Sequence, residues 1–204
     1  MCCEKNLPFE HDTDMKEFGA AWFGAETGNL APPILIDGDL TISQSSACHV
    51  YLGKKLGLTA GIDTLEAECR AMQYMADLHD LHAEVLAPAR ASTEDVAALQ
   101  AHLTSDRYKN TLRAVDKCIK GPYYFGSEPS YMDFYADCYV CMLEGKWLGP
   151  LMEKSGDTIA TYAPKLKAAV DGVRALPSAA KMPTLNPVPP GLVLKPERVA
   201  TWQS

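Results

Sequence analysis

The feature that most constrains the fold of this chain is a change in the spacing of apolar residues near residues 59–62. Before it, two β-branched runs, Ile34–Ile36 and Leu40–Ile42, flank the turn sequence Asp37–Asp39. This arrangement predicts a β-hairpin. From Asp63 onward, apolar residues recur at helical spacing instead. The sequence therefore predicts a small α/β unit followed by an all-helical one.

A helix is expected directly after the hairpin, from Ser45 to about Leu56. Either Ser43 or Ser45 can cap its start, because a serine oxygen can accept a hydrogen bond from a first-turn N–H group. Gly57 follows two lysines and is a typical stop signal.

A long helix is predicted from Asp63 to Ala87, with Pro88 ending it. We expect its apolar stripe to face the core; this stripe consists of Leu65, Cys69, Met72 and Ala76. The opposite face is polar and consists of Gln73, Asp77, Asp80 and Glu84.

Three further helices are predicted, one over about Thr93–Lys120, one starting at Ser130 and one following Pro164. Ser130 and Asp133 are predicted to form a capping box, in which each polar side chain bonds the backbone N–H group of the other residue. Each side of this box is worth about 1 kcal/mol. Residues 184–204 are too rich in proline to be helical, so we expect an extended or partner-bound tail.

Composition narrows the class of protein. The 204 residues carry a net charge of −7 and are 47% apolar, which suits a folded core and lacks the basic surface of a nucleic-acid binder. The sequence offers neither a signal peptide nor a membrane span, so we expect a cytoplasmic protein. Seven scattered cysteines predict buried free thiols, including Cys138 and Cys141 within a helix.

Two motifs in this order resemble a known family. Residues Pro33–Ser45, followed by Tyr51-Leu52-Gly53, are similar to the second half of the glutathione-binding domain of cytosolic glutathione transferases of the pi, mu and sigma types. The segment Gly126-x-x-x-Ser130-x-x-Asp133 resembles the capping box and staple of the same family's helical domain. The resemblance implies a thioredoxin-like α/β domain over residues 1–58, incomplete at its start, and an all-α domain over residues 63–183.

The resemblance also implies a site for glutathione as co-substrate, with no metal. Pro33 corresponds to the family's cis-proline, and Pro32, which lacks an N–H group, precedes it where the backbone would pair with glutathione. Gln44 and Ser45 match the pair that holds the γ-glutamyl group. Further candidates are Asp80, or else Asp77, for the ammonium group, and Trp22 and Lys16 for the glycyl carboxylate.

One departure from the family matters most. Residues 1–8 correspond to the end of the family's first helix, so the preceding strand and the Tyr, Ser or Cys that activates glutathione have no counterpart. We expect weak or absent catalysis, because the thiolate is the nucleophile. Loss of that central strand would also leave a gap between a strand around Phe9 and the Ile34 strand. Either the chain is part of a longer protein, or the sheet rearranges, or a partner supplies a strand.

Two functions follow from these observations. The first is glutathione conjugation to a small hydrophobic electrophile, in a homodimer or larger assembly. The alternative is a non-catalytic scaffold of the same fold that engages protein partners. His79-x-x-His82 has helical spacing for a metal, but surface histidines are the preferred interpretation.

Overall fold

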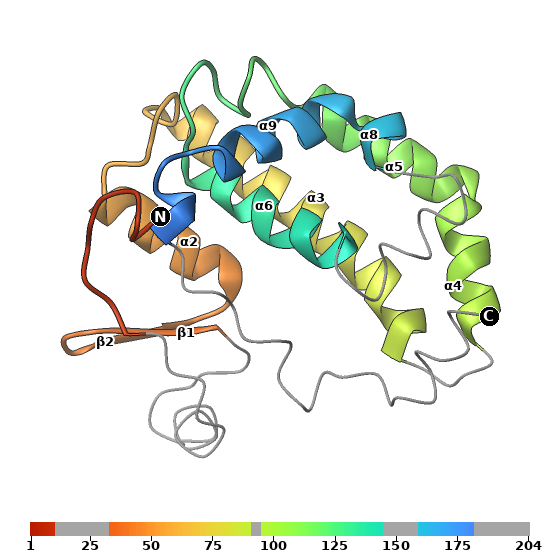
Figure 1. Ribbon diagram of the computed structural model, residues 1–204, viewed down its shortest axis with the longest axis horizontal. Helices are drawn as coiled ribbons and strands as arrows, with labels where there is room; N and C mark the ends of the chain where they lie inside the picture. Colours follow the sequence, from red (N-terminus) through yellow and green to blue (C-terminus); the bar gives the residue numbers. More distant parts are fainter. Residues whose placement is uncertain (11–32, 91–94, 145–158, 182–204) are drawn as a thin grey trace.

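The computed structural model describes residues 1–10, 33–90, 95–144 and 159–181. The hairpin lies against one side of helix α2 (Ser45–Lys55), and the longer helices form a layer beyond it (Figure 1). The elements are β1 (Ile34–Asp37), β2 (Leu40–Ser43), α2 (Ser45–Lys55), α3 (Leu65–Arg90), α4 (Asp95–Thr104), α5 (Asp106–Lys117), α6 (Tyr131–Glu144), α8 (Ile159–Tyr162), α9 (Pro164–Arg174) and the 3-10 helix η1 (Ala179–Lys181).

The hairpin prediction is confirmed. β1 and β2 pair antiparallel, from Ile34 opposite Ser43 to Asp37 opposite Leu40. Gly38 takes the turn at φ 61°, a conformation that glycine adopts without steric cost. Within the described residues the sheet has these two strands alone. The segment around Phe9, where a further strand was expected, has no regular structure there.

Helix α2 joins the hairpin to the helical layer through a close contact with α6. Gly53 is buried beneath Tyr131, so that a Cβ atom at residue 53 would lie 2.4 Å from the Tyr131 Cβ. The Tyr131 N–H also donates a 2.8 Å hydrogen bond to the Leu58 carbonyl. The first contact requires a residue without a side chain at position 53.

Helix α3 is turned relative to the prediction. Leu65 and Met72, expected to face the core, are 79% and 65% exposed. The core takes another stripe, made of Ala71, Tyr74, Met75, Leu78, Leu81 and Val85. Both stripes have helical spacing, and the one with the larger side chains packs on α6. The helix also runs through Pro88 to Arg90, so the predicted end at Pro88 is wrong.

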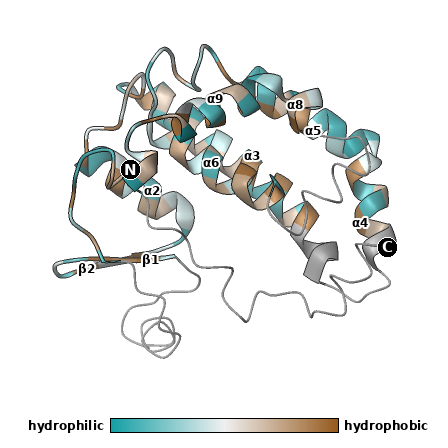
Figure 2. Ribbon diagram, viewed as in Figure 1, coloured by the Kyte–Doolittle hydropathy of each residue, from teal (hydrophilic) through white to brown (hydrophobic). Residues whose placement is uncertain are grey.

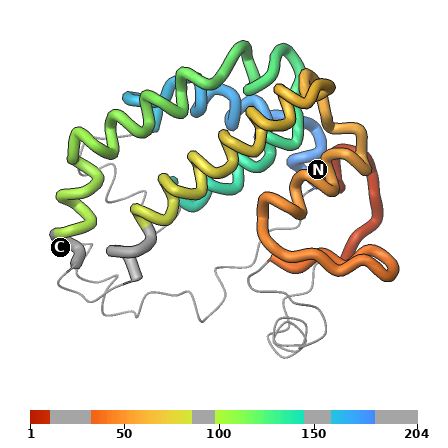
Figure 3. Tube along the Cα trace, turned by 180° about the vertical axis from the view of Figure 1, so that it is seen from behind, coloured from red at the N-terminus to blue at the C-terminus, as the bar shows by residue number. Residues whose placement is uncertain are grey.

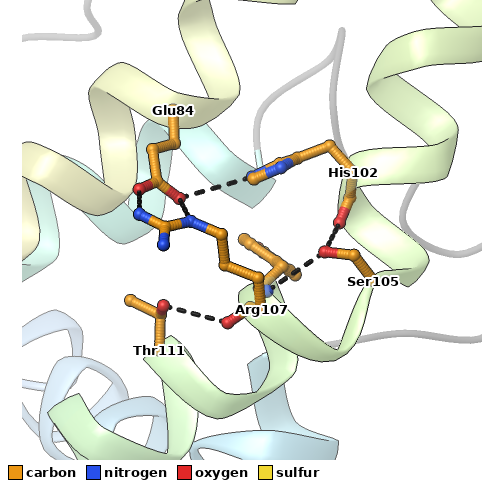
Figure 4. A network of polar contacts seen from close by, with 6 residues as sticks. Glu84, His102, Ser105, Arg107 and Thr111 are labelled. Carbon is orange, nitrogen blue, oxygen red and sulfur yellow. Dashed lines mark hydrogen bonds and ion pairs between the residues drawn. The ribbon is translucent and has the colours of Figure 1, made fainter.

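The single helix expected over 93–120 is two helices. Ser105 breaks it: its side chain accepts a hydrogen bond from the Tyr108 N–H at 3.2 Å and caps α5. Glu84 of α3 links both pieces, because it accepts two hydrogen bonds from Arg107 and lies 3.8 Å from His102 Nε2 (Figure 4). This network holds α3, α4 and α5 together.

The capping box at the start of α6 is confirmed on the Asp133 side, whereas the Ser130 hydroxyl bonds the N–H group of Met132 and not that of Asp133. Asp133 is fully buried and accepts hydrogen bonds from the N–H groups of Ser130 and Tyr124, each at 2.8 Å. The Ser130 hydroxyl donates to the same carboxylate at 2.9 Å and accepts from the Met132 N–H. Burial raises the pKa of Asp133, and these hydrogen bonds act against that rise.

The helical layer encloses the core. Seen from behind, α3 and α6 run side by side, and these two helices contact each other extensively (Figure 3). Helix α6 is on average hydrophobic, whereas α5 is amphipathic and mainly hydrophilic (Figure 2). None of the described helices is both long and apolar enough to cross a membrane. Cys48 is buried as expected, but the expectation of buried thiols is wrong for Cys69, Cys138 and Cys141, which are exposed.

Candidate functional site

A groove of about 1180 Å³ separates the hairpin and α2 from α3. Its walls come from β2, from one face of α2, from α3 and from the first turns of α6, and Met72 and Ala76 of the stripe that was expected in the core are among the lining residues. The lining residues are Leu40, Ile42, Gln44, Ser46, Ala47, Val50, Tyr51, Lys54, Lys55, Glu68, Met72, Met75, Ala76, His79, Asp80, Tyr131 and Tyr135. This set brings together two predicted site residues that are 36 positions apart, Gln44 and Asp80.

Gln44 has an unusual backbone at the start of α2. It is the N-cap residue with φ 76° and ψ 132°, a conformation that side chains rarely adopt, and its side chain makes no capping hydrogen bond. The expectation that Ser43 or Ser45 caps this helix is therefore wrong, because Ser45 is already its first residue. The exposed Gln44 amide remains available to a ligand.

The first turn of α2 is an anion-binding arrangement. In any α-helix the first N–H groups lack intrahelical acceptors, and the helix dipole adds positive potential there. No side chain of the described residues caps these groups at α2, and its first turn contains no acidic residue. A ligand carboxylate fits this position chemically.

The Ser45 hydroxyl points towards helix α6. Its side chain hydrogen-bonds Tyr139 of α6, and its carbonyl lies 2.7 Å from His49 Nδ1. Burial lowers the pKa of His49, so the neutral ring donates its Nδ1 proton to that carbonyl. The structure therefore fixes the Ser45 backbone and directs its side chain towards α6.

The structure distinguishes the two candidate acids on α3. Asp80 is exposed and lines the groove, whereas Asp77 is half-buried and does not line it. Burial raises the pKa of Asp77, and the nearby Asp80 carboxylate raises it further. Asp80 is thus the better-placed partner for a ligand cation in this groove.

Most of the remaining groove surface is apolar, although Ser46, Lys54 and Glu68 also line it. Met72 and Leu40 are exposed, and Val50 and Ala76 line the groove with them. Salt bridges border it, including Lys54 to Glu68 at 2.7 Å. An apolar surface beside a few polar groups is typical of small-molecule sites and of protein interfaces. The polar groups Gln44, His79 and Asp80 are called the polar end of the groove below.

The remaining predicted residues are only partly described. Pro33 is exposed, and its carbonyl lies 3.8 Å from the Cys48 thiol. Pro32, Trp22 and Lys16 lie outside the described residues. No cluster of three metal-binding side chains occurs within the described ranges. A smaller cavity of about 340 Å³, beside Arg70 and Lys120, contains none of the predicted residues.

Comparison with solved structures identifies the fold. The glutathione S-transferase Blo t 8 superposes with a TM-score of 0.64 at 21% identity, over 88% of this chain and 82% of that one. Rat hPGDS complexed with a quinoline gives 0.66 at 18% identity, over 88% and 85%. Maleylacetoacetate isomerase from Anaeromyxobacter dehalogenans 2CP-1, with bound dicarboxyethyl glutathione and citrate, gives 0.58 at 16% identity, over 97% and 87%.

These similarities show that the chain has the glutathione-transferase fold, with an incomplete thioredoxin-like part and a helical part. At these levels of identity they establish the fold alone. No family model matches the sequence. No curated protein matches it either.

Sequence reasoning missed several groove residues. Tyr135 lines the groove, and Tyr139, which contacts His79, lies on the same helix, which was identified only by its start. His79 is exposed as expected, but its place in the groove was not predicted. Their signal was present in the spacing of four between Tyr135 and Tyr139, which places both on one helical face. What no spacing could show is that this face meets the start of α2.

Proposed function

We propose that this protein binds glutathione at the polar end of the groove and conjugates it to a small hydrophobic electrophile. The observation that carries the proposal is the shared groove of Gln44 and Asp80 at the uncapped start of α2. The γ-glutamyl group carries a carboxylate and an ammonium, and the helix start and Asp80 have the complementary charges.

The apolar surface of the groove supports the proposal that the second substrate is hydrophobic. Met72, Met75 and Ala76 of α3 form a surface on which an uncharged ring or chain can pack. No described residue is assigned to activation of the thiol, so we expect the conjugation rate to be low. The proposed location is the cytoplasm, where glutathione and reduced thiols occur.

The experiment measures glutathione binding and conjugation together. Millimolar glutathione should raise the thermal midpoint, because a ligand that binds only the folded state stabilises it. Gln44→Ala should abolish most of this shift and most of the turnover of a generic aryl halide. Gln100→Ala, at an exposed glutamine of α4, is the matched control and should change neither. A shift and a turnover that Gln44→Ala leaves intact would refute the site.

A second function is a scaffold that engages protein partners through the same groove, most simply as a homodimer. Its volume of about 1180 Å³ exceeds the usual 300–1,000 Å³ of small-molecule sites, and Met72 is 65% exposed on its wall. Met72→Glu should then reduce the solution mass of an assembly without changing the glutathione-induced shift. An unchanged mass would count against this interface.

A further inference from the structure

The polar end of the groove contains a residue to which the proposed function gives no role. His79 precedes Asp80 on α3, is exposed, and lines the same groove as Gln44. A carboxylate and an imidazole that line one groove can meet the two halves of an α-amino acid: a carboxylate accepts from an ammonium, and an imidazole N–H donates to a carboxylate.

The His79 ring is held from behind by α6. Its Nδ1 lies 3.3 Å from the Tyr139 hydroxyl, and the two rings are packed edge to face with centroids 6.4 Å apart. The Tyr139 hydroxyl in turn lies 3.0 Å from the hydroxyl of Tyr135. Burial raises the pKa of Tyr139, so its phenol keeps the proton needed for hydrogen bonding.

One arrangement of protons makes Tyr139 the donor to His79. The Tyr135 hydroxyl, which also lies 3.3 Å from the Met75 carbonyl, and the Ser45 hydroxyl donate to the Tyr139 oxygen, and the Tyr139 proton is then directed to His79 Nδ1. A neutral imidazole that accepts at Nδ1 carries its proton on Nε2. Within the described part of the chain, no hydrogen bond or ion pair engages that Nε2.

We propose that His79 Nε2–H donates to the α-carboxylate of the bound γ-glutamyl group and so makes the site specific for ligands with that carboxylate. Tyr139 is a positioning residue that orients the ring. The inference rests on the proposed function, since it assigns a new contact within the same site. It predicts selectivity for a complete α-amino acid head group over an amine alone.

The test pairs variants with two ligands, glutathione and its decarboxylated analogue 4-aminobutyryl-cysteinylglycine. Calorimetric titration of the full chain should give His79→Leu a glutathione affinity about tenfold weaker, the equivalent of one hydrogen bond to a charged group. The same variant should bind the analogue as tightly as the unaltered protein. His79→Gln, whose amide nitrogen can occupy the place of Nε2, should restore most of the affinity.

Tyr139→Phe should weaken glutathione binding about threefold, and its loss should be smaller when His79→Leu is already present, because Tyr139 acts on the ligand through His79 and separately contacts Ser45. Gln100→Leu is the control for a polar-to-apolar change on an exposed helix. Equal losses for both ligands, or no loss for either, would overturn the assignment of His79. Absence of glutathione binding by the unaltered protein would instead refute the proposed function and this contact together, whereas binding that depends on Gln44 and not on His79 would refute this contact alone.

Discussion

The start of α6 and the start of α2 are built in opposite ways. At α6, the Ser130 and Asp133 side chains are fully buried and every hydrogen bond is internal. At α2, the cap has no side-chain hydrogen bond and no residue of either strand is buried. Stability therefore resides in the helical layer, while the hairpin and α2 keep polar groups available to a ligand. The following predictions test this contrast.

The largest loss of stability is expected for Asp133→Ala. The change leaves the buried Ser130 and Tyr124 N–H groups without an acceptor, at a cost of about 3 kcal/mol in the free energy of unfolding. Denaturant titration measures it. The control is Asp171→Ala, at an exposed ion pair with Lys167, with a cost of about 0.5 kcal/mol or less. A loss for Asp133→Ala as small as that of the control would contradict the contrast.

Gly53→Ala should have the next largest effect and act on the hairpin side. The added Cβ collides with Tyr131, which forces α2 from α6 and costs about 2 kcal/mol. Hydrogen exchange should show faster opening of α2 and the hairpin, while α3 and α6 keep their protection. Uniform acceleration throughout the chain would mean that the two regions unfold together.

Acidification should weaken the start of α2 through His49. Its pKa is lowered by burial in the folded chain, so the unfolded chain binds the proton more readily. This contribution is fully present above the ordinary histidine value of 6.5 and is lost as the pH falls below it, at no more than about 1.4 kcal/mol per pH unit. Thermal midpoints between pH 7.5 and 5 should fall less steeply for His49→Gln. An identical slope in the variant would assign the pH dependence to another group.

The smallest effect is expected for Lys54→Ala. Its ammonium pairs with Glu68 at the border of the groove, but both side chains are more than 40% exposed, so the pair contributes about 0.5 kcal/mol or less. The variant stands next to Gly53 in the same helix and serves as its control. A loss comparable to that of Gly53→Ala would show that any change at this surface separates α2 from α6.

Local signals predicted much of this fold. The turn at Gly38, the capping box at Ser130 and the helix after Pro164 depend on residues close together in the sequence, and each lies where it was expected. The rotation of α3 could not be predicted in this way. Two stripes of its residues share the helical period, and only packing on α6 selects the one with Tyr74 and Leu78.

The candidate site could be predicted only in part, because some of its contacts join residues that are distant in the sequence. The resemblance indicated Gln44 and Asp80, and the structure places both in one groove. Whether they hold glutathione stays a prediction. The contact of His79 with Tyr139 joins residues 60 positions apart on different helices, and no short-range pattern encodes such a meeting.

Because of the left-handed backbone at Gln44, the residue that gives the highest thermal stability at this position differs from the one that serves ligand binding. Glycine at this position would relieve the strain and raise the melting temperature, and it would also remove the amide from the groove. A directed-evolution campaign scored on thermal tolerance alone should enrich glycine at residue 44. A campaign that also requires ligand retention should return glutamine. A difference between the two outcomes would show that Gln44 contributes to ligand binding at the expense of thermal stability.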